Sequence, residues 1–423
     1  MPIEAVTRTS PWSTYELFGN DDLNVAAGVV LTSTGNDAIL AYDAAGLHRI
    51  TVAGTIIAYD DCINLLGSEG AQYVEIAETG LLMSGVGSDI ETADGVLMYG
   101  VGSAMVNNGT IIAQGSAVQL VVSDGGTTTV TNNGVMTTES YGIWNRFGSG
   151  TLEFTNTGTV ESAVQSYLGG GFVDHVTNSG TMIGNVELGG GDDLYVGTGG
   201  SVAGAILGGS GDDRFVVGLS NEAIDGGEGI DTLDLSGLHQ KMTVNLTAPS
   251  QNKGAGVAGD SYAGIENIIG TVCRDVLTGD GVDNRLHGGG SHDMLAGAGG
   301  NDTLAGGHGA DTLTGGAGAD VFVFETYADR GDVLTDFTTG ADVMLIDAAA
   351  YGFGSVAIGA LGAGAFLTTA DSNTAQDATD RLIFRASDAT LWFDRDGTGD
   401  LGPVLLADLA DGTTITTTDI FLI

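Results

Sequence analysis

Apolar residues recur with a nine-residue period between positions 270 and 324. The period is plainest in four consecutive segments: GGGSHDMLA (288–296), GAGGNDTLA (297–305), GGHGADTLT (306–314) and GGAGADVFV (315–323). When each nine-residue phrase is numbered from its first glycine, the eighth position is apolar, at Leu277, Leu286, Leu295, Leu304, Leu313 and Phe322. A short fixed period with glycines at fixed offsets indicates one small unit stacked on itself, which is a solenoid. A glycine-rich linker would have no reason to keep these apolar positions.

The phrase divides into a turn and a strand. Its first six residues predict a tight turn, because glycine accepts backbone angles that other residues avoid. Its last three residues predict a strand, with the eighth side chain facing the core. Two phrases then make one coil of eighteen residues, and the sixth positions of successive coils stack at Asp275, Asn284, Asp293, Asp302, Asp311 and Asp320. Fainter phrases at 188–196, 208–216 and 226–234 add Asp193, Asp213 and Asp231.

The stacked sixth positions predict a metal site. Carboxylates and backbone carbonyls would converge there with almost no lysine or arginine nearby, so the turns need a cation. An all-oxygen, multi-ligand site of this kind favours Ca²⁺ over Mg²⁺, which prefers a strict octahedron and keeps its waters. The phrases at 270–287 have lost glycines and carry Asn284 in place of a carboxylate. We expect weaker binding there.

A longer repeat occupies the first half of the chain. Its clearest copies are VNNGTII (106–112), VTNNGVM (130–136), FTNTGTV (154–160) and VTNSGTM (176–182). The turn glycines of these copies recur at a nearly constant interval, at Gly109, Gly134, Gly158 and Gly180. Short β-branched strands with polar bends at this spacing predict the coils of a right-handed parallel β-helix. The aligned Asn107, Asn132, Asn156 and Asn178 predict a ladder of side-chain amides. The pattern resembles the β-helical passengers of secreted bacterial adhesins.

Composition narrows the functional classes. The 423 residues include 54 acidic and 12 basic side chains, for a net charge of −42. This charge argues against nucleic acid as a partner. It also predicts that the repeats stay loose where calcium is scarce and fold where calcium binds. No window of eighteen apolar residues predicts a transmembrane segment, and the N-terminus has no secretory signal pattern. Cys62 and Cys273 lie far apart and are expected to be small buried residues.

The nine-residue phrase resembles the GGxGxDxUx repeat of the repeat-in-toxin (RTX) family, the calcium-binding β-roll. The resemblance implies several Ca²⁺ ions, an extracellular location, and export by a type I secretion machinery that reads an uncleaved C-terminal signal. Asp419 and the four apolar residues after it resemble such a signal. The segment 330–347 resembles the one that closes these rolls, so Asp332 and Asp336 are further candidate ligands. Asp394 to Asp400 resembles half an EF-hand loop, although a hairpin turn is the simpler interpretation.

The expected fold is therefore all-β. It comprises a parallel β-helix over 1–187, a calcium-binding β-roll over 188–324 with an insert at about 235–269, and a small β-rich C-terminal cap and secretion-signal region over 325–423. The two lysines and Pro249 of the insert predict an exposed hairpin or loop. In the N-terminal half, two GND fragments place Asp22 and Asp37 where a cation or an ordinary turn would explain them.

Two functions remain open. The preferred one is a non-catalytic surface, matrix or adhesive component, with a cell-surface polysaccharide or a second copy of the chain as candidate partner. The alternative is a polysaccharide lyase or epimerase with its active site on the β-helix, for which Asp174 with His175, and Tyr141 with Arg146, are the best candidates. These groups do not form a polar cluster in the sequence, and no HExxH motif of a zinc protease is present. We therefore predict that the chain is not an enzyme.

Overall fold

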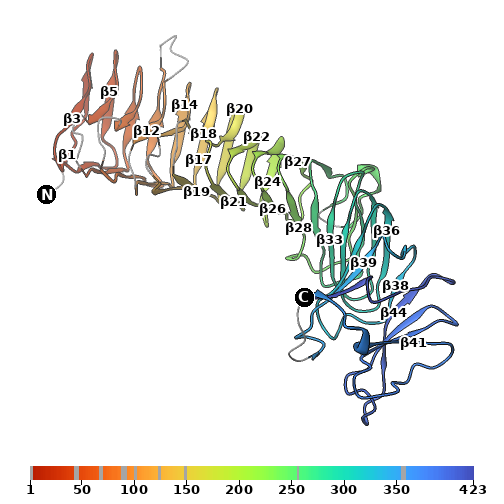
Figure 1. Ribbon diagram of the computed structural model, residues 1–423. Helices are drawn as coiled ribbons and strands as arrows, with labels where there is room; N and C mark the ends of the chain where they lie inside the picture. The colour runs from red at the N-terminus through yellow and green to blue at the C-terminus, as the bar shows by residue number, and fades with distance from the viewer. Residues whose placement is uncertain are drawn as a thin grey trace. The chain divides into compact units, whose positions relative to one another are not determined.

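The computed structural model describes residues 3–41, 47–65, 70–86, 93–99, 102–121, 125–146, 150–254, 257–353 and 359–423. The chain forms two compact units, one of Met1–Asp231 with Tyr262–Gly264 and one of Thr232–Ser261 with Ile265–Ile423. Both are built from strands, as predicted (Figure 1). The described residues contain no helix long and apolar enough to cross a membrane. The predicted three-part division at residues 187 and 324 stays a prediction.

The first unit begins with coils of three strands each. One side of the coils consists of β1 (Ile3–Glu4), β4 (Leu23–Val25), β7 (Arg49–Val52), β10 (Tyr73–Ile76), β13 (Ala104–Asn107), β16 (Thr127–Asn132), β19 (Thr151–Asn156), β21 (Asp174–Asn178), β23 (Leu194–Val196) and β26 (Arg214–Val216). A second side consists of β2 (Arg8–Ser10), β5 (Val30–Ser33), β8 (Thr55–Ile57), β11 (Leu81–Met83), β14 (Thr110–Ala113) and β17 (Val135–Thr138). A third consists of β3 (Tyr15–Leu17), β6 (Ile39–Ala41), β9 (Ile63–Leu65), β12 (Val96–Tyr99), β15 (Val118–Val121) and β18 (Tyr141–Asn145).

After residue 145 the second and third strands of a coil run together as one long strand. There β20 (Thr159–Leu168) pairs with both β17 and β18, and β22 (Thr181–Gly190) stacks on it in turn. The remaining strands of this side are β24 (Ser201–Ala203), β25 (Ala205–Ser210), β27 (Ala223–Glu228) and β30 (Ser261–Ala263). Residues paired between successive coils lie one coil apart in the sequence. The coil from Val130 to its partner Phe154 is longer than the coil from Val176 to its partner Tyr195. The unit therefore changes from long coils to short ones within a single solenoid.

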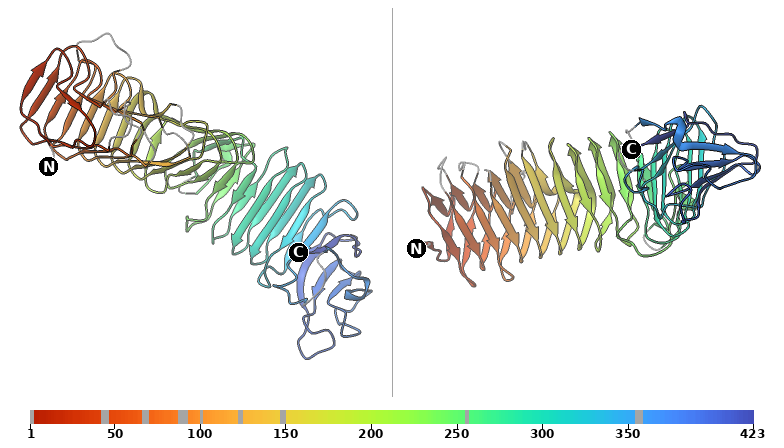
Figure 2. Two further views of the ribbon diagram at one scale, coloured as in Figure 1. Left: turned by 60° about the vertical axis from the view of Figure 1, so that its left-hand side comes forward. Right: turned by 60° about the horizontal axis from the view of Figure 1, so that its bottom comes forward.

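The strands of the first unit stack on one another from coil to coil (Figure 2). Their parallel registers align like residues. Val25, Val52 and Ile76 are aligned with one another and are fully buried. The next four coils place asparagines at this position. The side-chain amide of Asn107 donates to Asn132 at 2.8 Å, that of Asn132 to Asn156 at 2.8 Å, and that of Asn156 to Asn178 at 2.9 Å. These bonds confirm the predicted amide ladder, which pairs polar groups that would otherwise be costly to bury.

The second unit contains the dense repeats. One side of its coils consists of β28 (Thr232–Asp234), β31 (Asn267–Ile269), β33 (Arg285–Gly290), β35 (Thr303–His308), β37 (Val321–Phe324), β39 (Val343–Ile346) and β45 (Ile420–Leu422). The other consists of β29 (Thr243–Asn245), β32 (Val276–Thr278), β34 (Met294–Gly299), β36 (Thr312–Ala317), β38 (Asp332–Leu334) and β44 (Val404–Leu409). Leu286 pairs with Leu304 and Leu295 with Leu313, which confirms the eighteen-residue coil. The eighth-position side chains are at most 1 % exposed.

The insert differs in part from its predicted exposed hairpin. Its strand β29 pairs in parallel with β32, and Val244 in this strand and Met242 just before it are buried in the core. The short 3₁₀ helix η1 (Pro249–Gln251) and the chain around it form the exposed part. The prediction gave too much weight to the lysines and too little to the alternating apolar residues that begin the segment.

The C-terminal region closes the repeats. It contains β40 (Gly359–Ala360), η2 (Ala363–Ala365), β41 (Phe366–Thr369), β42 (Leu382–Arg385) and β43 (Thr390–Phe393). β43 and β44 pair antiparallel, so residues 394–403 form the predicted hairpin connection. β44 and β45 each add a strand beyond β38 and β39. This pairing covers edges that would otherwise expose unpaired backbone groups.

Candidate metal centre

The sixth-position carboxylates of the second unit are linked from coil to coil. The backbone N–H of Asp275 donates to Oδ1 of Asp293 at 2.7 Å, and the N–H of Asp293 donates to Oδ1 of Asp311 at 2.7 Å. Asp311 in turn donates to Oδ1 of Asp332 at 3.0 Å. We call each such series a carboxylate ladder. Stacked turns thus bring Asp275, Asp293, Asp311 and Asp332 together, as the sequence predicted.

A second carboxylate ladder runs along the other side of the same coils. The N–H of Asn284 donates to Oδ1 of Asp302 at 2.8 Å, and that of Asp302 to Oδ1 of Asp320 at 2.9 Å. The N–H of Asp320 donates to Oδ1 of Asp342 at 2.9 Å. Sequence reasoning missed Asp342. The signal was present, because GADV at 340–343 repeats GADV at 318–321.

The first unit has a carboxylate ladder of its own. The N–H of Asp193 donates to Oδ1 of Asp213, and that of Asp213 to Oδ1 of Asp231, both at 2.8 Å. The series starts one coil earlier than predicted, since the N–H of Asp174 donates to Oδ1 of Asp193 at 2.6 Å. Asp174 is fully buried. It is therefore part of this ladder rather than an accessible catalytic group beside His175.

The second carboxylate oxygen shows what the ladders are suited to bind. Oδ2 has no hydrogen-bond partner and is buried in six of these side chains: Asp193, Asp213, Asp293, Asp302, Asp311 and Asp332. Backbone oxygens lie beside it. A Cβ built on Gly288 would lie 2.5 Å from Oδ2 of Asp293 and 2.6 Å from the carbonyl oxygen of Gly306. Only glycine at the first position lets these oxygens approach one another so closely.

Charge makes these sites unstable without a cation. Burial raises the pKa of Asp193 to about 8, of Asp293 to about 7 and of Asp302 to about 6. The neighbouring ladder carboxylates raise these pKa values further, whereas the N–H that each side chain accepts lowers them. Buried, like-charged oxygens without donors fit a hard divalent cation. The residues present therefore suit Ca²⁺, which would supply the missing positive charge.

Three predicted ligands differ from the others in their contacts. Both oxygens of Asp336 accept backbone N–H groups, from Gly315 at 2.9 Å and Gly316 at 2.8 Å, so this side chain holds a turn. Asn284 accepts from the N–H of Asp280 and donates to the carbonyl of Glu266. Oδ2 of Asp275 accepts the N–H of Thr271 at 2.7 Å. These contacts leave less oxygen free for a cation at the start of the dense block, and just after its end, than in its middle.

The sequence Arg330-Gly331-Asp332 is an RGD tripeptide, a motif that can mediate adhesion when its aspartate is exposed. The side chain of Asp332 is fully buried in a carboxylate ladder, so the tripeptide does not expose its carboxylate for adhesion.

Of the two cysteines, Cys62 is buried as predicted, but Cys273 is only half-buried. Both are free thiols.

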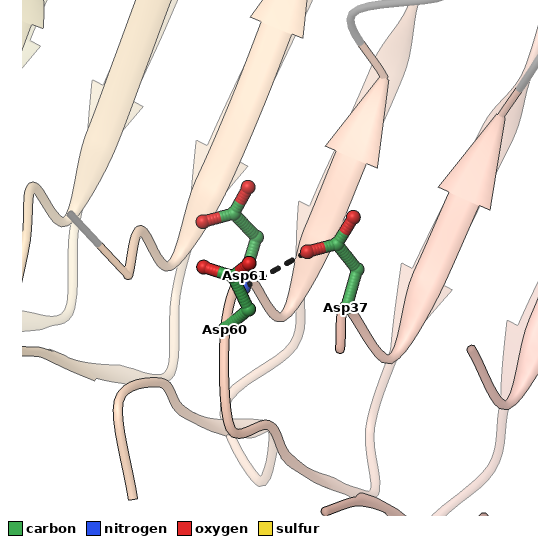
Figure 3. Close-up of side chains that lie close together, drawn as sticks. All are labelled: Asp37, Asp60 and Asp61. Atoms are coloured by element: carbon green, nitrogen blue, oxygen red, sulfur yellow. Dashed lines mark hydrogen bonds between the residues drawn. The ribbon is translucent and has the colours of Figure 1, made fainter. Parts of the chain in front are cut away.

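Another acidic cluster lies in the N-terminal coils. Asp37, Asp60 and Asp61 approach one another closely enough for a metal, and the N–H of Asp61 donates to Oδ1 of Asp37 at 3.2 Å (Figure 3). The side-chain amide of Asn64 donates to Oδ2 of Asp37 at 3.1 Å and to Oδ2 of Asp61 at 3.2 Å. Asn64 thus already satisfies the oxygens that a cation would need, and we assign no ion here.

Comparison with known protein families agrees with this geometry. The family of RTX calcium-binding nonapeptide repeats matches four segments of the chain: 198–233, 262–295, 269–304 and 287–322. The chain therefore contains RTX repeats, and such repeats bind several Ca²⁺ ions. Among solved structures, the extracellular lipase LipA from Serratia marcescens is similar at 16 % identity and a TM-score of 0.23. The similarity covers 66 % of this chain and 41 % of the lipase, so the chain spans less than half of that protein's length. No curated protein matches the chain significantly.

Proposed function

We propose that this RTX-repeat protein is secreted by a type I machinery, folds on binding calcium outside the cell, and serves there as a non-catalytic surface, matrix or adhesive component. The buried, unpartnered Oδ2 atoms of the carboxylate ladders carry the proposal. In six of the ladder aspartates, the carboxylate that joins two coils leaves its other oxygen without a donor. The coils can therefore stack fully only when positive charge is supplied.

The charge and the packing of the chain distinguish its calcium-free state from its calcium-bound state. Without calcium, a net charge of −42 favours an extended chain, because like charges repel one another in a compact fold. With calcium, the carboxylates are compensated, the backbone N–H groups find their ladder acceptors, and the eighth-position side chains pack. Binding free energy then becomes folding free energy.

The segment that resembles a secretion signal lies in a sheet of the folded protein. Its last residues form β45, in which Ile420 pairs with Met344 and Leu422 with Ile346. The carboxylate of Asp419 also accepts the N–H groups of Gly340 and Thr416. In the folded protein these residues belong to a sheet. A secretion machinery would read them more readily in the unfolded, calcium-free chain, and proteins with RTX repeats are typically secreted.

The surroundings of the candidate catalytic groups favour a non-catalytic role. Asp174 is buried, and Nδ1 of His175 lies 2.8 Å from Oε1 of Glu153 in a half-exposed pair. The guanidinium of Arg146 lies over the ring of Trp144 at 5.0 Å. These residues are engaged in separate contacts rather than converging on one reacting atom.

Circular dichroism of the full chain tests the proposal. In metal-free buffer we expect little β-signal from the repeats, with a cooperative gain at millimolar calcium and a much smaller one with equal magnesium. Identical spectra with and without calcium would refute the calcium-dependent step. Incubation of the calcium-loaded protein with alginate and pectin tests the remaining part. We expect no unsaturated sugar products, and their appearance would instead favour the lyase.

A further inference from the structure

An aromatic cluster lies in the C-terminal part of the second unit. Its rings belong to Tyr327, Tyr351, Phe353 and Phe393, and the centres of neighbouring rings lie 5.1 to 6.1 Å apart. Three of these side chains are buried, whereas Tyr327 is half-buried. The rings come from the turn after β37, the segment after β39 and the end of β43, so folding of the second unit brings them together.

Two exposed arginines lie over the ring of Tyr327. The guanidinium carbon of Arg330 is 5.1 Å from the ring centre, and that of Arg395 is 5.9 Å from the same centre. An aromatic face attracts a cation, so the ring holds both side chains in place. Neither guanidinium donates a hydrogen bond to the described residues, and both therefore keep their N–H groups available for a ligand.

A third arginine is held more deeply in the same cluster. Arg381 is half-buried, and its guanidinium carbon lies 5.3 Å from the ring centre of Phe353 and 5.6 Å from that of Phe393. Its Nε donates to the carbonyl oxygen of Asp394 at 2.9 Å and its Nη2 to that of Gly352 at 3.2 Å. Nη1 has no hydrogen-bond partner among the described residues. The two carbonyls fix the orientation of this guanidinium without neutralising its charge.

Neighbouring carboxylates do not pair with these arginines. Among the described residues, the ion pairs involve other side chains. Burial lowers the pKa of Arg381, the nearby Asp394 opposes this shift, and the guanidinium of Arg395 adds to it by like-charge repulsion. Asp394 is itself buried, and its Oδ1 accepts the N–H of Asp396 at 3.2 Å. Positive charge is therefore gathered here with little direct compensation.

Arg385 shows that an arginine stacked on a ring can also pair with a carboxylate. It lies over Trp392 at 5.2 Å, and its Nε donates to Oδ1 of Asp388 at 2.8 Å. Arg49 likewise lies over a tyrosine ring and contacts Glu75 at 3.9 Å. The chain has 54 acidic residues and only 12 basic ones. Three neighbouring guanidiniums without an ion pair in the described part of such a chain point to an anion from outside it.

We propose that Arg330, Arg381 and Arg395 bind the carboxylates of an acidic polysaccharide. A guanidinium is a planar fork that matches a carboxylate through two parallel hydrogen bonds. Guanidiniums spread over one aromatic cluster suit a polymer with a carboxylate on successive sugar rings better than a single small anion. The net charge of −42 permits this contact, because charges beyond ~8 Å are largely screened at physiological ionic strength. The site gives a ligand class to the extracellular role proposed above, and it rests on that role.

Calorimetric titration of the calcium-loaded full chain tests this site. We expect a mannuronate hexasaccharide to bind and a neutral dextran hexasaccharide not to bind. Arg330→Gln and Arg395→Gln should each weaken mannuronate binding about tenfold. Both side chains are exposed, so the circular dichroism of the two variants in calcium should match wild type. Arg385→Gln removes the same charge from the same region and is the matched control, with wild-type affinity expected.

Three outcomes would overturn the site. Wild-type affinity in both Arg330→Gln and Arg395→Gln would show that the sugar binds elsewhere, for example through calcium in the carboxylate ladders. Tighter binding of a polyglutamate peptide than of mannuronate would identify a protein partner instead. A chain that folds on calcium but binds no mannuronate would refute this site alone, whereas a chain that does not respond to calcium would refute the proposed function itself.

Discussion

The backbone N–H of Asp293 donates a 2.7 Å hydrogen bond to Oδ1 of Asp311, the equivalent side chain one coil further along. The bond uses one carboxylate oxygen and leaves Oδ2 of Asp311 buried without a donor. The same side chain therefore ties two coils together and presents an oxygen to a cation. Coil stacking and calcium binding are coupled through a single residue.

Removing one ladder charge should weaken calcium binding. Asp302→Asn keeps an oxygen for the N–H of Asn284 but presents a neutral group where a buried carboxylate was. We expect the calcium midpoint of folding, followed by circular dichroism, to rise about tenfold, equivalent to about 1.4 kcal/mol. Asp371→Asn removes the same charge from an exposed site and should leave the midpoint unchanged. Equal midpoints for the two variants would contradict the ligand role of Asp302.

Stability should depend on pH in opposite ways with and without calcium. In the metal-free fold, burial raises the pKa of Asp302 to about 6, of Asp293 to about 7 and of Asp332 to about 8, whereas an unfolded aspartate titrates near ~3.9. A group whose pKa is raised on folding stabilises the fold below its unfolded pKa, and that stability is lost as pH rises through the folded pKa. Protonation at pH 5 should therefore restore part of the fold that the metal-free repeats lack at pH 8, which gives more β-signal and a higher melting temperature at pH 5.

Calcium should reverse this trend, because protons compete with the ion for the same oxygens. At saturating calcium we expect a higher melting temperature at pH 8 than at pH 5. Calorimetry of dialysed, metal-free and calcium-loaded protein at the two pH values provides the comparison. A metal-free protein that is more stable at pH 8 would show that the ladder carboxylates are not buried as described.

At the second position of the nine-residue phrase, two substitutions should change the stability of the fold in opposite directions. Gly307 has φ of 84°, and a Cβ there would collide with the carbonyl oxygen of Gly289. Gly307→Ala should cost about 2 kcal/mol or more, since a left-handed backbone disfavours any side chain even without a clash. Ala298 occupies the equivalent position with the same φ of 84°. Ala298→Gly should stabilise by about 1 kcal/mol, after allowance for the greater freedom of glycine in the unfolded chain.

Urea unfolding at saturating calcium measures both changes. The midpoint should fall for Gly307→Ala and rise for Ala298→Gly. Shifts in the same direction for the two variants would argue against the left-handed turn at this position.

The asparagine ladder should contribute stability independently of calcium. Asn132→Ala removes the acceptor of Asn107 and the donor to Asn156, and leaves both amides buried. We expect a loss of about 2 kcal/mol, with the calcium midpoint of the repeats unchanged. Asn133 makes a comparable bond to Asn108 at 2.8 Å but on the exposed surface, so Asn133→Ala should be nearly neutral. Thermal unfolding in calcium compares the two, and equal losses would exclude a special role for burial.

Regular spacing made most of the fold predictable. The eighth positions, the aligned asparagines and the sixth-position aspartates each repeat often enough for the period to identify their environment. Asp174 and Asp342 were missed because their phrases are irregular: Phe172 takes the place of a glycine, and the stretch from Asp320 to Asp342 is longer than one regular coil. Stacking corrects such irregularities, since a coil can bulge outward while its ladder residue stays in register.

Single-copy features were harder to predict. Asp336 was expected to be a ligand because the segment 330–347 resembles the one that closes RTX rolls, yet it accepts two turn N–H groups. Nothing in one copy of a motif distinguishes these roles. In the insert, Lys241 and Lys253 suggested that the segment is exposed to solvent, whereas Val244 between them is buried in the core.

Hydrogen exchange at the ladder amides is the most direct test of the coupling between calcium and folding. The N–H groups of Asp193, Asp293 and Asp302 each donate to the next carboxylate. We predict that they exchange at rates close to those of an unfolded chain in metal-free buffer and become strongly protected together when calcium is added. Strong protection of all three amides without calcium would contradict the account.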